Sequence, residues 1–263
     1  MLFNKFNFKT SFKTFNKEGV IVIKNLINKK VINNIISEIE LITNDQLKKN
    51  KFKIKKRNFH DLIRYAFKNK KNELRFFLYH RLRSLPTVQS LCFSNELTSI
   101  LKKLGQKIPS CVQKPTIRFD FAEENKFKLK PHQDIRAILC TKCITIWIPL
   151  TKVNKKNGTI RVYKRSQKEG LLKHIFDKNN QVVVKNLAKI DNYDFVDIDA
   201  DIGDMIIMNS FCTHSSVKGE KNSIKINIQS FYNDLTDINI NDKYYNLQEI
   251  PDAGKKTLYS EYK

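Results

Sequence analysis

Two histidines and one aspartate are the residues of this chain whose types and spacing could do chemistry. His132 and Asp134 stand two apart in the triplet His132-Gln133-Asp134, and His214 follows 80 residues after Asp134. Two imidazoles and one carboxylate form the set that binds non-haem Fe(II) on one face and leaves the opposite positions open for a cosubstrate and O2. If these side chains meet in space, the sequence predicts an oxygenase.

The spacing within the triplet suits a shared metal ion. Residues i and i+2 of an extended segment project to the same face, so His132 and Asp134 can reach one ion. His214 comes just after the strand-like run 203–208, and distant strands can be neighbours in a barrel. A His-x-Asp triplet alone is a weak signal, because most such triplets are ordinary loop residues.

Lys225 is a candidate for binding an anionic cosubstrate. The strand-like segment 223–231 alternates isoleucines on one face with Lys225, Asn227 and Gln229 on the other. A buried cation is costly without a partner, and the far carboxylate of a dicarboxylate such as 2-oxoglutarate would supply one. The alternative is that this face points into water. The alternation supports both interpretations equally.

Arg118 and Asp120 share one face of the segment 116–121. Arg118 could reach the mouth of the site and contact substrate or cosubstrate, but we slightly favour a surface charge pattern for the pair. The three remaining histidines are expected to be ordinary polar surface residues: His60, His80 and His174.

The elements that must position these residues change character along the chain. A short β-branched strand follows Gly19, and residues 31–42 and 59–105 carry apolar residues at helical spacing, with breaks at Pro86 and Gly105. From about residue 111 the period becomes two, and strands are expected at 114–121, 134–139, 143–150, 158–163, 181–185, 193–198, 203–209 and 223–232. Short strands after a helical first half indicate a β-sandwich or barrel flanked by helices.

Length and composition favour one domain. The 263 residues are 41% hydrophobic, no apolar run approaches the roughly 20 residues that span a bilayer, and the start of the chain lacks the features of a signal peptide. We expect a single cytoplasmic domain over residues 1–263, with its core at about 14–235 and a polar C-terminal tail.

The five cysteines are scattered, which favours reduced thiols. Cys140 and Cys143 form one CxxC pair without the second pair that a structural zinc site needs. We therefore favour two small residues beside a strand over a metal or redox site.

The formal net charge of +23 has two explanations. One is a nucleic-acid footprint; the other is biased coding, which also fits the abundance of lysine, asparagine, isoleucine and phenylalanine. The densest basic run, 48–57, has no stacking-aromatic or helix-turn-helix signature beside it. We favour a solvated segment there, and nucleic acid is not expected as a partner.

Several motifs, taken in order, resemble the phytanoyl-CoA dioxygenase family. They are His132-Gln133-Asp134, TIWIPL at 145–150, NGTIRV at 157–162, GLLKH at 170–174, and Gly203-Asp204 running to His214. The resemblance covers roughly residues 14–235. It implies a mainly β fold with flanking helices, a double-stranded β-helix (a cupin-like jelly roll) with the N-terminal helices packed outside.

The resemblance also implies Fe(II), the cosubstrate 2-oxoglutarate and O2. His132, Asp134 and His214 fall on the iron ligands of the family, and Lys225 falls where the family usually has an arginine for the far carboxylate of 2-oxoglutarate. Trp147 falls on a strand position that lines the cosubstrate pocket. Ser216 falls on a polar position that can contact the same carboxylate.

Two departures from the family pattern matter. Lysine at position 225 keeps the charge but loses the bidentate fork of arginine. The family's Pro-Gly-Ser-His turn is replaced by Lys164-Arg165-Ser166-Gln167, which puts the shape of the substrate entrance in doubt.

The resemblance implies a hydroxylase that forms succinate and CO2. Related halogenases carry a small residue in place of Asp134, so the intact aspartate favours hydroxylation, or another oxidation such as desaturation. The expected substrate is a small metabolite, a saccharide or a lipid or acyl intermediate, and the basic balance makes an anionic one attractive. The alternative is a catalytically inactive basic jelly-roll protein that binds a polyanion. The sequence gives no indication of oligomeric state.

Overall fold

The helices come mainly from the first half of the chain. The computed structural model describes residues 4, 9–53, 57–112, 115–125, 128–134, 140–178 and 181–237. The helices are α1 (Lys9–Glu18), α2 (Lys29–Lys49), α3 (Phe59–Leu82), α4 (Pro86–Cys92), α5 (Asn95–Lys103) and the short α6 (Leu187–Asp191), with a 3-10 turn η3 (Ser166–Glu169). Within these described ranges, no helix is long and apolar enough to cross a membrane.

The larger of two facing sheets has the order β1-β9-β4-β11, and both β2 and β3 pair with β11. Every pairing in it is antiparallel. Its strands are β1 (Val20–Ile23), β2 (Pro109–Cys111), β3 (Thr116–Phe121), β4 (Ile144–Pro149), β9 (Met205–Asn209) and β11 (Ile224–Asp234). The long strand β11 is therefore hydrogen-bonded along both of its edges.

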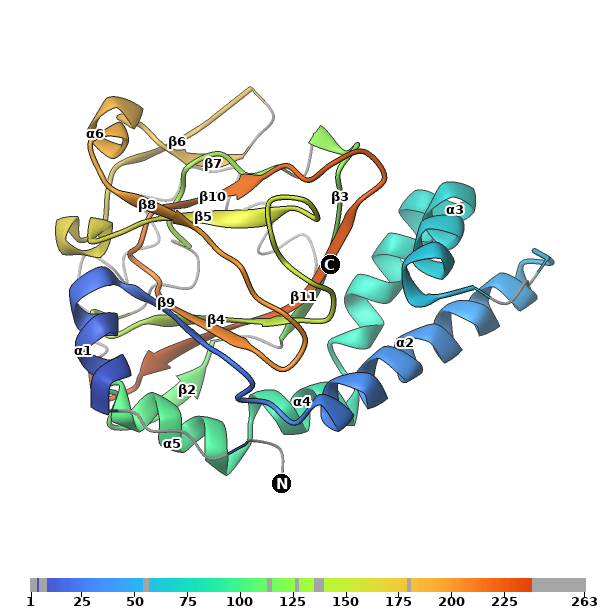
Figure 1. Ribbon diagram of the computed structural model, residues 1–263, viewed down its shortest axis with the longest axis horizontal. Coiled ribbons are helices and arrows are strands. Elements are labelled where there is room, and N and C mark those ends of the chain that lie inside the picture. The colour runs from blue at the N-terminus through green and yellow to red at the C-terminus, as the bar shows by residue number, and fades with distance from the viewer. Residues whose placement is uncertain are drawn as a thin grey trace, which may run out of the picture.

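The smaller sheet has the order β10-β5-β8, and β6 and β7 form a separate hairpin. The strands are β5 (Thr159–Tyr163), β6 (His174–Phe176), β7 (Val182–Val184), β8 (Phe195–Asp197) and β10 (His214–Val217). Apolar residues of both sheets pack in one interior cluster, with Trp147 and Ile206 from the larger sheet and Ile160 and Val162 from the smaller. The two sheets thus enclose an interior (Figure 1).

The helices cover the outer face of the larger sheet. Ile146 and Ile148 of β4 belong to the same buried cluster as helix residues such as Ile35 and Leu78, and Figure 1 shows α2 to α5 along one side of this sheet. The intervening Trp147 belongs to the interior cluster between the sheets. Strand β4 is buried on both faces, which explains its almost continuous apolar sequence.

Most predicted elements are confirmed to within a few residues. Pro86 does not simply interrupt a helix; it is the first residue of α4, where a missing N–H costs nothing. The predicted strand 134–139 lies outside the described residues apart from Asp134, as does 54–56 of the basic run. The strand β10 was not predicted, because its sequence HSSV has no apolar alternation and forms by pairing with β5.

Gly19 forms the predicted turn before β1. Its φ is +80°, and a Cβ there would lie 2.3 Å from the Cys212 Sγ atom. The Gly19 carbonyl accepts a hydrogen bond from the Asn209 backbone N–H at 2.8 Å. The absent side chain therefore lets the N-terminal turn pack directly against the segment that leads to His214.

Candidate metal centre

A backbone bridge brings the His132 segment to β10. The His132 N–H donates to the His214 carbonyl at 3.0 Å, and the His214 N–H donates to the His132 carbonyl at 2.9 Å. The next contact of the same ladder joins the Ser216 N–H to the Leu129 carbonyl at 2.8 Å. Residues separated by 82 positions thus lie side by side at the edge of the smaller sheet, and their rings are 4.3 Å apart.

The three predicted ligands converge. One donor atom from each of His132, Asp134 and His214 lies within 4.8 Å of the other two. The Nε2 atoms of His132 and His214 are 3.9 and 3.6 Å from the two Asp134 carboxylate oxygens. Two ligand atoms that each lie about 2.1 Å from an ion are at most about 4.2 Å apart, so a small closure of this triad suffices to hold one metal ion.

Both imidazole rings are oriented by a hydrogen bond between Nδ1 and a backbone carbonyl. The His132 Nδ1 lies 2.7 Å from the Lys130 carbonyl and the His214 Nδ1 lies 3.0 Å from the Cys212 carbonyl. A carbonyl only accepts, so each Nδ1 carries the proton and each Nε2 presents its lone pair toward Asp134. Burial, reinforced by the neighbouring His214, lowers the pKa of His132 well below its usual range, which keeps the ring neutral.

Asp134 is held from the larger sheet. The Thr145 hydroxyl of β4 donates to the Asp134 Oδ2 at 3.0 Å, and the same hydroxyl lies 2.9 Å from the Ser210 Oγ. The centre therefore spans both sheets, with two histidines on the smaller and the carboxylate anchored to the larger. Sequence reasoning missed Thr145, because a threonine in a β-strand carries no distinguishing signal.

Gln133, between the two ligands, fastens the site to the surrounding loops. Its side chain is 1% exposed; its Nε2 donates to the Gly170 carbonyl at 2.8 Å and to the Phe211 carbonyl at 2.6 Å. Its Oε1 accepts from the Leu172 N–H at 2.9 Å. One side chain thus ties the segment bearing His132 and Asp134 to the loop preceding His214.

Replacing Gln133 should weaken metal binding without removing a ligand. In Gln133→Leu, one buried carbonyl, one partly buried carbonyl and one partly buried N–H lose their partners, so we expect a loss of about 3 kcal/mol in the free energy of unfolding. Metal affinity should fall about 10- to 100-fold, as for other residues that orient ligands. Urea unfolding and a metal titration measure the two effects.

Gln106 provides the matched control. It is also buried, and its Nε2 donates to the carbonyls of Lys142 and Tyr232 at 2.6 and 3.1 Å, away from the triad. Gln106→Leu should destabilise the protein while the metal affinity stays at the wild-type value. Equal losses of metal affinity in both variants would show that Gln133 acts only through global stability.

His174 is not the ordinary surface residue that was predicted. It is half-buried, its Nδ1 lies 2.8 Å from the Leu172 carbonyl, and its Nε2 accepts a hydrogen bond from the Gln133 N–H at 3.2 Å. Burial lowers its pKa, consistent with the neutral ring that these contacts require. It therefore supports the metal-binding segment from behind.

Lys225 faces the interior, so the water-facing alternative for β11 is wrong. Its side chain is 3% exposed, and its Nζ lies 3.3 Å from the Asp120 Oδ2 and 3.4 Å from the Thr159 carbonyl of the opposite sheet. The same atom is 5.0 Å from the centre of the Trp147 ring, within the range of a cation–π contact. The predicted cosubstrate residues Lys225 and Trp147 are thus neighbours.

The prediction of a surface charge pattern for Arg118 and Asp120 is also wrong. The Arg118 Nη2 lies 3.3 Å from the Asp120 Oδ1, and both side chains are mostly buried. Burial alone would raise the pKa of Asp120, but Arg118 and Lys225 outweigh it and lower that pKa. The same ion pair raises the pKa of Arg118 against the effect of burial. Asp120 therefore stays ionised and bridges the two cations.

Ser216 and Lys225 lie close enough to line the same space. Both line a small cavity of about 10 Å³ together with Asp120 and Lys128, which is room for about one water molecule. The Ser216 Oγ accepts a hydrogen bond from the Leu129 N–H at 3.1 Å. Its hydroxyl is thus already used in the ladder that aligns the His132 segment with β10.

The segment 164–167, where the family turn is replaced, supports His214. The Ser166 Oγ donates to the Tyr163 carbonyl at 2.6 Å and accepts from the Thr213 N–H at 2.9 Å. Arg165 adopts a φ of 68° to begin the turn. The serine that survives from the family pattern thus holds the residue immediately before a metal ligand.

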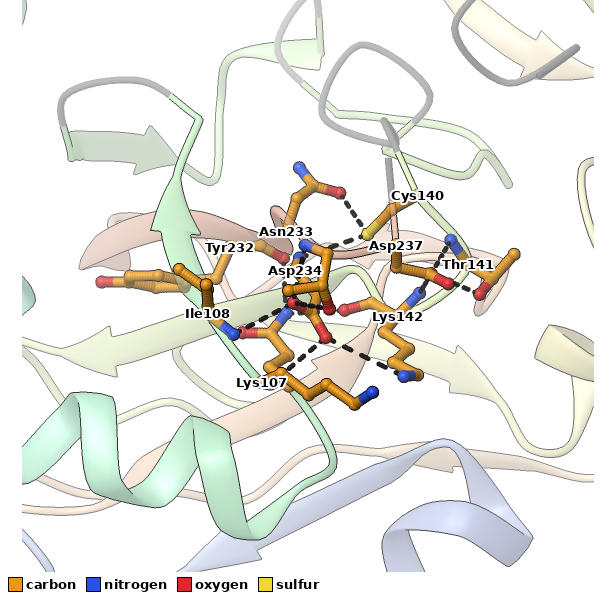
Figure 2. A network of polar contacts seen from close by, with 11 residues as sticks. Lys107, Ile108, Cys140, Thr141, Lys142, Tyr232, Asn233, Asp234 and Asp237 are labelled. Atoms are coloured by element: carbon orange, nitrogen blue, oxygen red, sulfur yellow. Dashed lines mark hydrogen bonds and ion pairs between the residues drawn. The ribbon is translucent and has the colours of Figure 1, made fainter. Parts of the chain in front are cut away.

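Cys140 and Cys143 are free, buried thiols, and the sulfur of Cys140 belongs to a polar network at the end of β11 (Figure 2). The Cys140 Sγ donates to the Asn233 Oδ1 at 3.1 Å and accepts from the Asp234 N–H at 3.3 Å. Burial raises the pKa of Cys140 to about 11. Burial also raises the pKa of Cys143, so both thiols stay protonated.

Comparisons with known proteins agree with this geometry. The family model for Phytanoyl-CoA dioxygenase (PhyH) matches residues 15–220. No curated protein sequence matches the chain.

Three solved structures illustrate the fold similarity. The chain is similar to the apo form of ThoJ, a non-heme monooxygenase, at 15% identity and a TM-score of 0.58, over 84% of this chain and 75% of that one. It is similar to SnoK, a non-heme alpha ketoglutarate dependent carbocyclase from nogalamycin biosynthesis, at 14% identity and a TM-score of 0.57, over 85% and 83%. It is also similar to the epimerase SnoN in complex with Fe3+, alpha ketoglutarate and nogalamycin RO, at 11% identity and a TM-score of 0.57, over 89% of this chain and 87% of that one. The predicted jelly roll with flanking helices is confirmed.

Proposed function

Because the chain belongs to the phytanoyl-CoA dioxygenase family of non-haem iron- and 2-oxoglutarate-dependent oxygenases, we propose that it hydroxylates an unactivated C–H bond of a small molecule. The reaction consumes the substrate, 2-oxoglutarate and O2 and yields the hydroxylated product, succinate and CO2. The observation that carries this proposal is the convergence of His132, Asp134 and His214. Two imidazoles and one carboxylate are the donor set that suits Fe(II) and leaves positions open.

The chain's own residues would hold the metal in a fixed orientation. The Lys130 and Cys212 carbonyls fix the tautomers of His132 and His214, so that both Nε2 atoms face the ion. The Thr145 hydroxyl fixes one oxygen of Asp134. Bound iron supplies the chemistry that couples oxidative decarboxylation of 2-oxoglutarate to C–H oxidation. A carboxylate at position 134 occupies a ligand position, which supports oxygenation over halogenation.

The charges of the interior support a site for both the metal and the cosubstrate. The cations Arg118 and Lys225 are balanced by Asp120 and Asp134. Fe(II) and the 2-oxoglutarate dianion also cancel each other, so the filled site stays close to neutral and avoids the cost of a buried net charge. We assign Lys225 to the far carboxylate of 2-oxoglutarate, with Trp147 as a wall of the same site.

The substrate would be a small metabolite, a saccharide or a lipid or acyl intermediate. SnoN and SnoK belong to the biosynthesis of a natural product, which makes intermediates of comparable complexity reasonable candidates. A binding screen against metabolites, with the metal site filled by an inert divalent ion, addresses this directly.

Succinate formation tests the proposed activity. Purified protein supplied with Fe(II), 2-oxoglutarate, O2 and ascorbate, which replaces the absent substrate as the two-electron donor, should form succinate, and omission of Fe(II), 2-oxoglutarate or O2, or addition of a chelator, should abolish it. Mass spectrometry or NMR measures the product. Succinate formation that persists without added metal in chelator-treated protein would contradict the proposal.

A further inference from the structure

Phe231 of β11 is a buried aromatic residue on the inner face of the larger sheet. Ile228 and Tyr232 of the same strand pack with the helices in the outer cluster, and successive residues of a strand point to opposite faces. Phe231 therefore points between the two sheets. The residue is 8% exposed, and within the described residues it belongs to none of the apolar clusters. Its ring thus lines the interior beside the packed core.

The cross-strand neighbour of Phe231 holds a candidate metal ligand. Phe231 stands opposite Thr145 of β4 in the sheet register, and the Cβ atoms of such a pair are about 5 Å apart. The Thr145 hydroxyl donates to the Asp134 Oδ2 at 3.0 Å. Phe231 is therefore one side chain away from the Asp134 carboxylate, on the same face of the sheet.

The open positions of the metal would lie on the side of the larger sheet. His132 and His214 approach from the edge of the smaller sheet, where a backbone bridge joins them. Two imidazoles and a carboxylate occupy one face of the ion and leave the opposite face open. That open face is directed toward the inner side of β11, where Gln229 and Phe231 are the successive inward residues.

The cosubstrate would leave the Phe231 ring uncovered. Lys225, to which we assign the far carboxylate of 2-oxoglutarate, is near the start of β11, whereas Phe231 is near its end. The cosubstrate therefore extends from the metal toward the start of the strand and away from Phe231. The space beside the ring is the part of the interior that remains for O2 and the substrate.

We propose that Phe231 is a self-oxidation site, at which the protein hydroxylates its own aromatic ring when no substrate fills this space. This inference rests on the proposed function. One ring C–H bond breaks and one C–O bond forms; one atom of O2 becomes the ring hydroxyl, and the other enters succinate as 2-oxoglutarate loses CO2. The ring and 2-oxoglutarate each supply two electrons to O2. A group held beside the reacting centre reacts far faster than one that must diffuse to it.

Two other buried aromatic residues of the same sheet are placed differently. Trp147 packs in the interior cluster, and its ring centre is 5.0 Å from the Lys225 ammonium group, at the end of the site that the cosubstrate fills. Phe119 of β3 packs in the outer cluster, with its ring centre 5.3 Å from that of Phe67 on α3. An indole is more easily oxidised than a phenyl ring, so oxidation of Phe231 before Trp147 would report position and not reactivity.

Mass spectrometry of peptides from the full-length protein tests the proposal. The protein is incubated with Fe(II), 2-oxoglutarate and isotopically labelled O2, without ascorbate, which would compete as the electron donor. The peptide that contains Phe231 should gain one labelled oxygen atom on the ring. Its oxidised fraction should exceed that of the Phe119 peptide at least about tenfold, because only Phe231 is held beside the metal.

The position of the ring is measured separately, without turnover. In protein with isotopically labelled phenylalanine, the Phe231 ring signals in the NMR spectrum are identified by their loss in Phe231→Leu. Mn(II) should broaden these signals at a lower metal concentration than it broadens those of Phe119, because paramagnetic relaxation falls steeply with distance. Zn(II), which is diamagnetic, should not broaden either set.

The outcomes separate this inference from the function on which it rests. Protein that forms succinate with ascorbate, but whose Phe231 ring stays unmodified, would overturn the inference and leave the proposed function standing. Oxidation that falls on Trp147 or Phe119 in place of Phe231, or Phe231 signals that broaden no earlier than those of Phe119, would also overturn it. Protein that forms no succinate even with ascorbate would contradict the proposed function itself, and the inference with it.

Discussion

Asp134→Ala is expected to abolish tight metal binding and to eliminate succinate formation. Asp134 is the only carboxylate among the three converging ligands, and its oxygens lie 3.9 and 3.6 Å from the two histidine Nε2 atoms. Removing a residue that merely orients a ligand costs about 10- to 100-fold in metal affinity, so removing a ligand should cost more than about 100-fold. A titration against a chelating indicator measures the affinity.

The fold should survive this substitution, which separates loss of the site from loss of structure. Asp134 makes its polar contacts with the Thr145 hydroxyl and with the two histidines. In the metal-free protein, replacing this side chain with alanine therefore removes these polar contacts and leaves the packing of the core unchanged. Asp194→Ala is the matched control, since that side chain is 75% exposed and pairs only at 3.7 Å with Arg165. Full metal affinity in Asp134→Ala would disprove the proposed ligand set.

Lys225→Met is expected to remove most of the affinity for 2-oxoglutarate and to destabilise the protein. Truncating one partner of a buried charge pair typically costs enough to raise a dissociation constant on the order of 100-fold. Asp120 would lose one of its two cations, although Arg118 remains 3.3 Å away. We therefore expect a loss of about 3 kcal/mol in the free energy of unfolding, at the lower end for a broken buried pair.

The double variant Asp120→Asn with Lys225→Met separates these two effects. Removing both charges removes the uncompensated carboxylate, so stability measured by urea unfolding should recover at least in part. The affinity for 2-oxoglutarate, measured on Zn(II)-loaded protein, should not recover, because the cation is still missing. Recovery of both quantities would show that Lys225 serves only to neutralise Asp120.

Lys225→Arg gives the complementary result. The guanidinium keeps the charge and restores a bidentate donor, so 2-oxoglutarate should bind at least as tightly as in the wild type if the cavity admits the larger group. A loss as large as that of the methionine variant would mean that shape, and not charge, governs this position.

The sequence alone predicted the types and order of the site residues. The triplet at 132–134, the histidine at 214 and the lysine at 225 are candidates from the sequence because each has a chemistry that few residue types share. The spacing of the apolar residues located most helices and strands. Burial of one face leaves apolar residues at a period of about 3.6 residues in a helix and of 2 residues in a strand. The features that lack such a repeat, such as β10 with its sequence HSSV, were missed.

Only the tertiary structure decided which face of β11 points inward. Alternate side chains of the strand project to opposite faces, which puts Lys225 and Asn227 on one face and Ile226 and Ile228 on the other. Both faces are buried, one against the helices and one between the sheets. Burial on both sides removes the difference in hydrophobic environment on which a sequence argument depends. The surface interpretation of Arg118 and Asp120 failed for this reason.

The candidate metal centre also depends partly on the sequence and partly on the tertiary structure. Sequence determined that His132, Asp134 and His214 are able to bind a metal together; it could not determine that they meet. They meet because two backbone hydrogen bonds join His132 to His214, and because Gln133 and Thr145 fix the segment between two sheets. These contacts link residues far apart in the chain, and backbone bonds of this kind carry no residue preference, so only the folded structure specifies them.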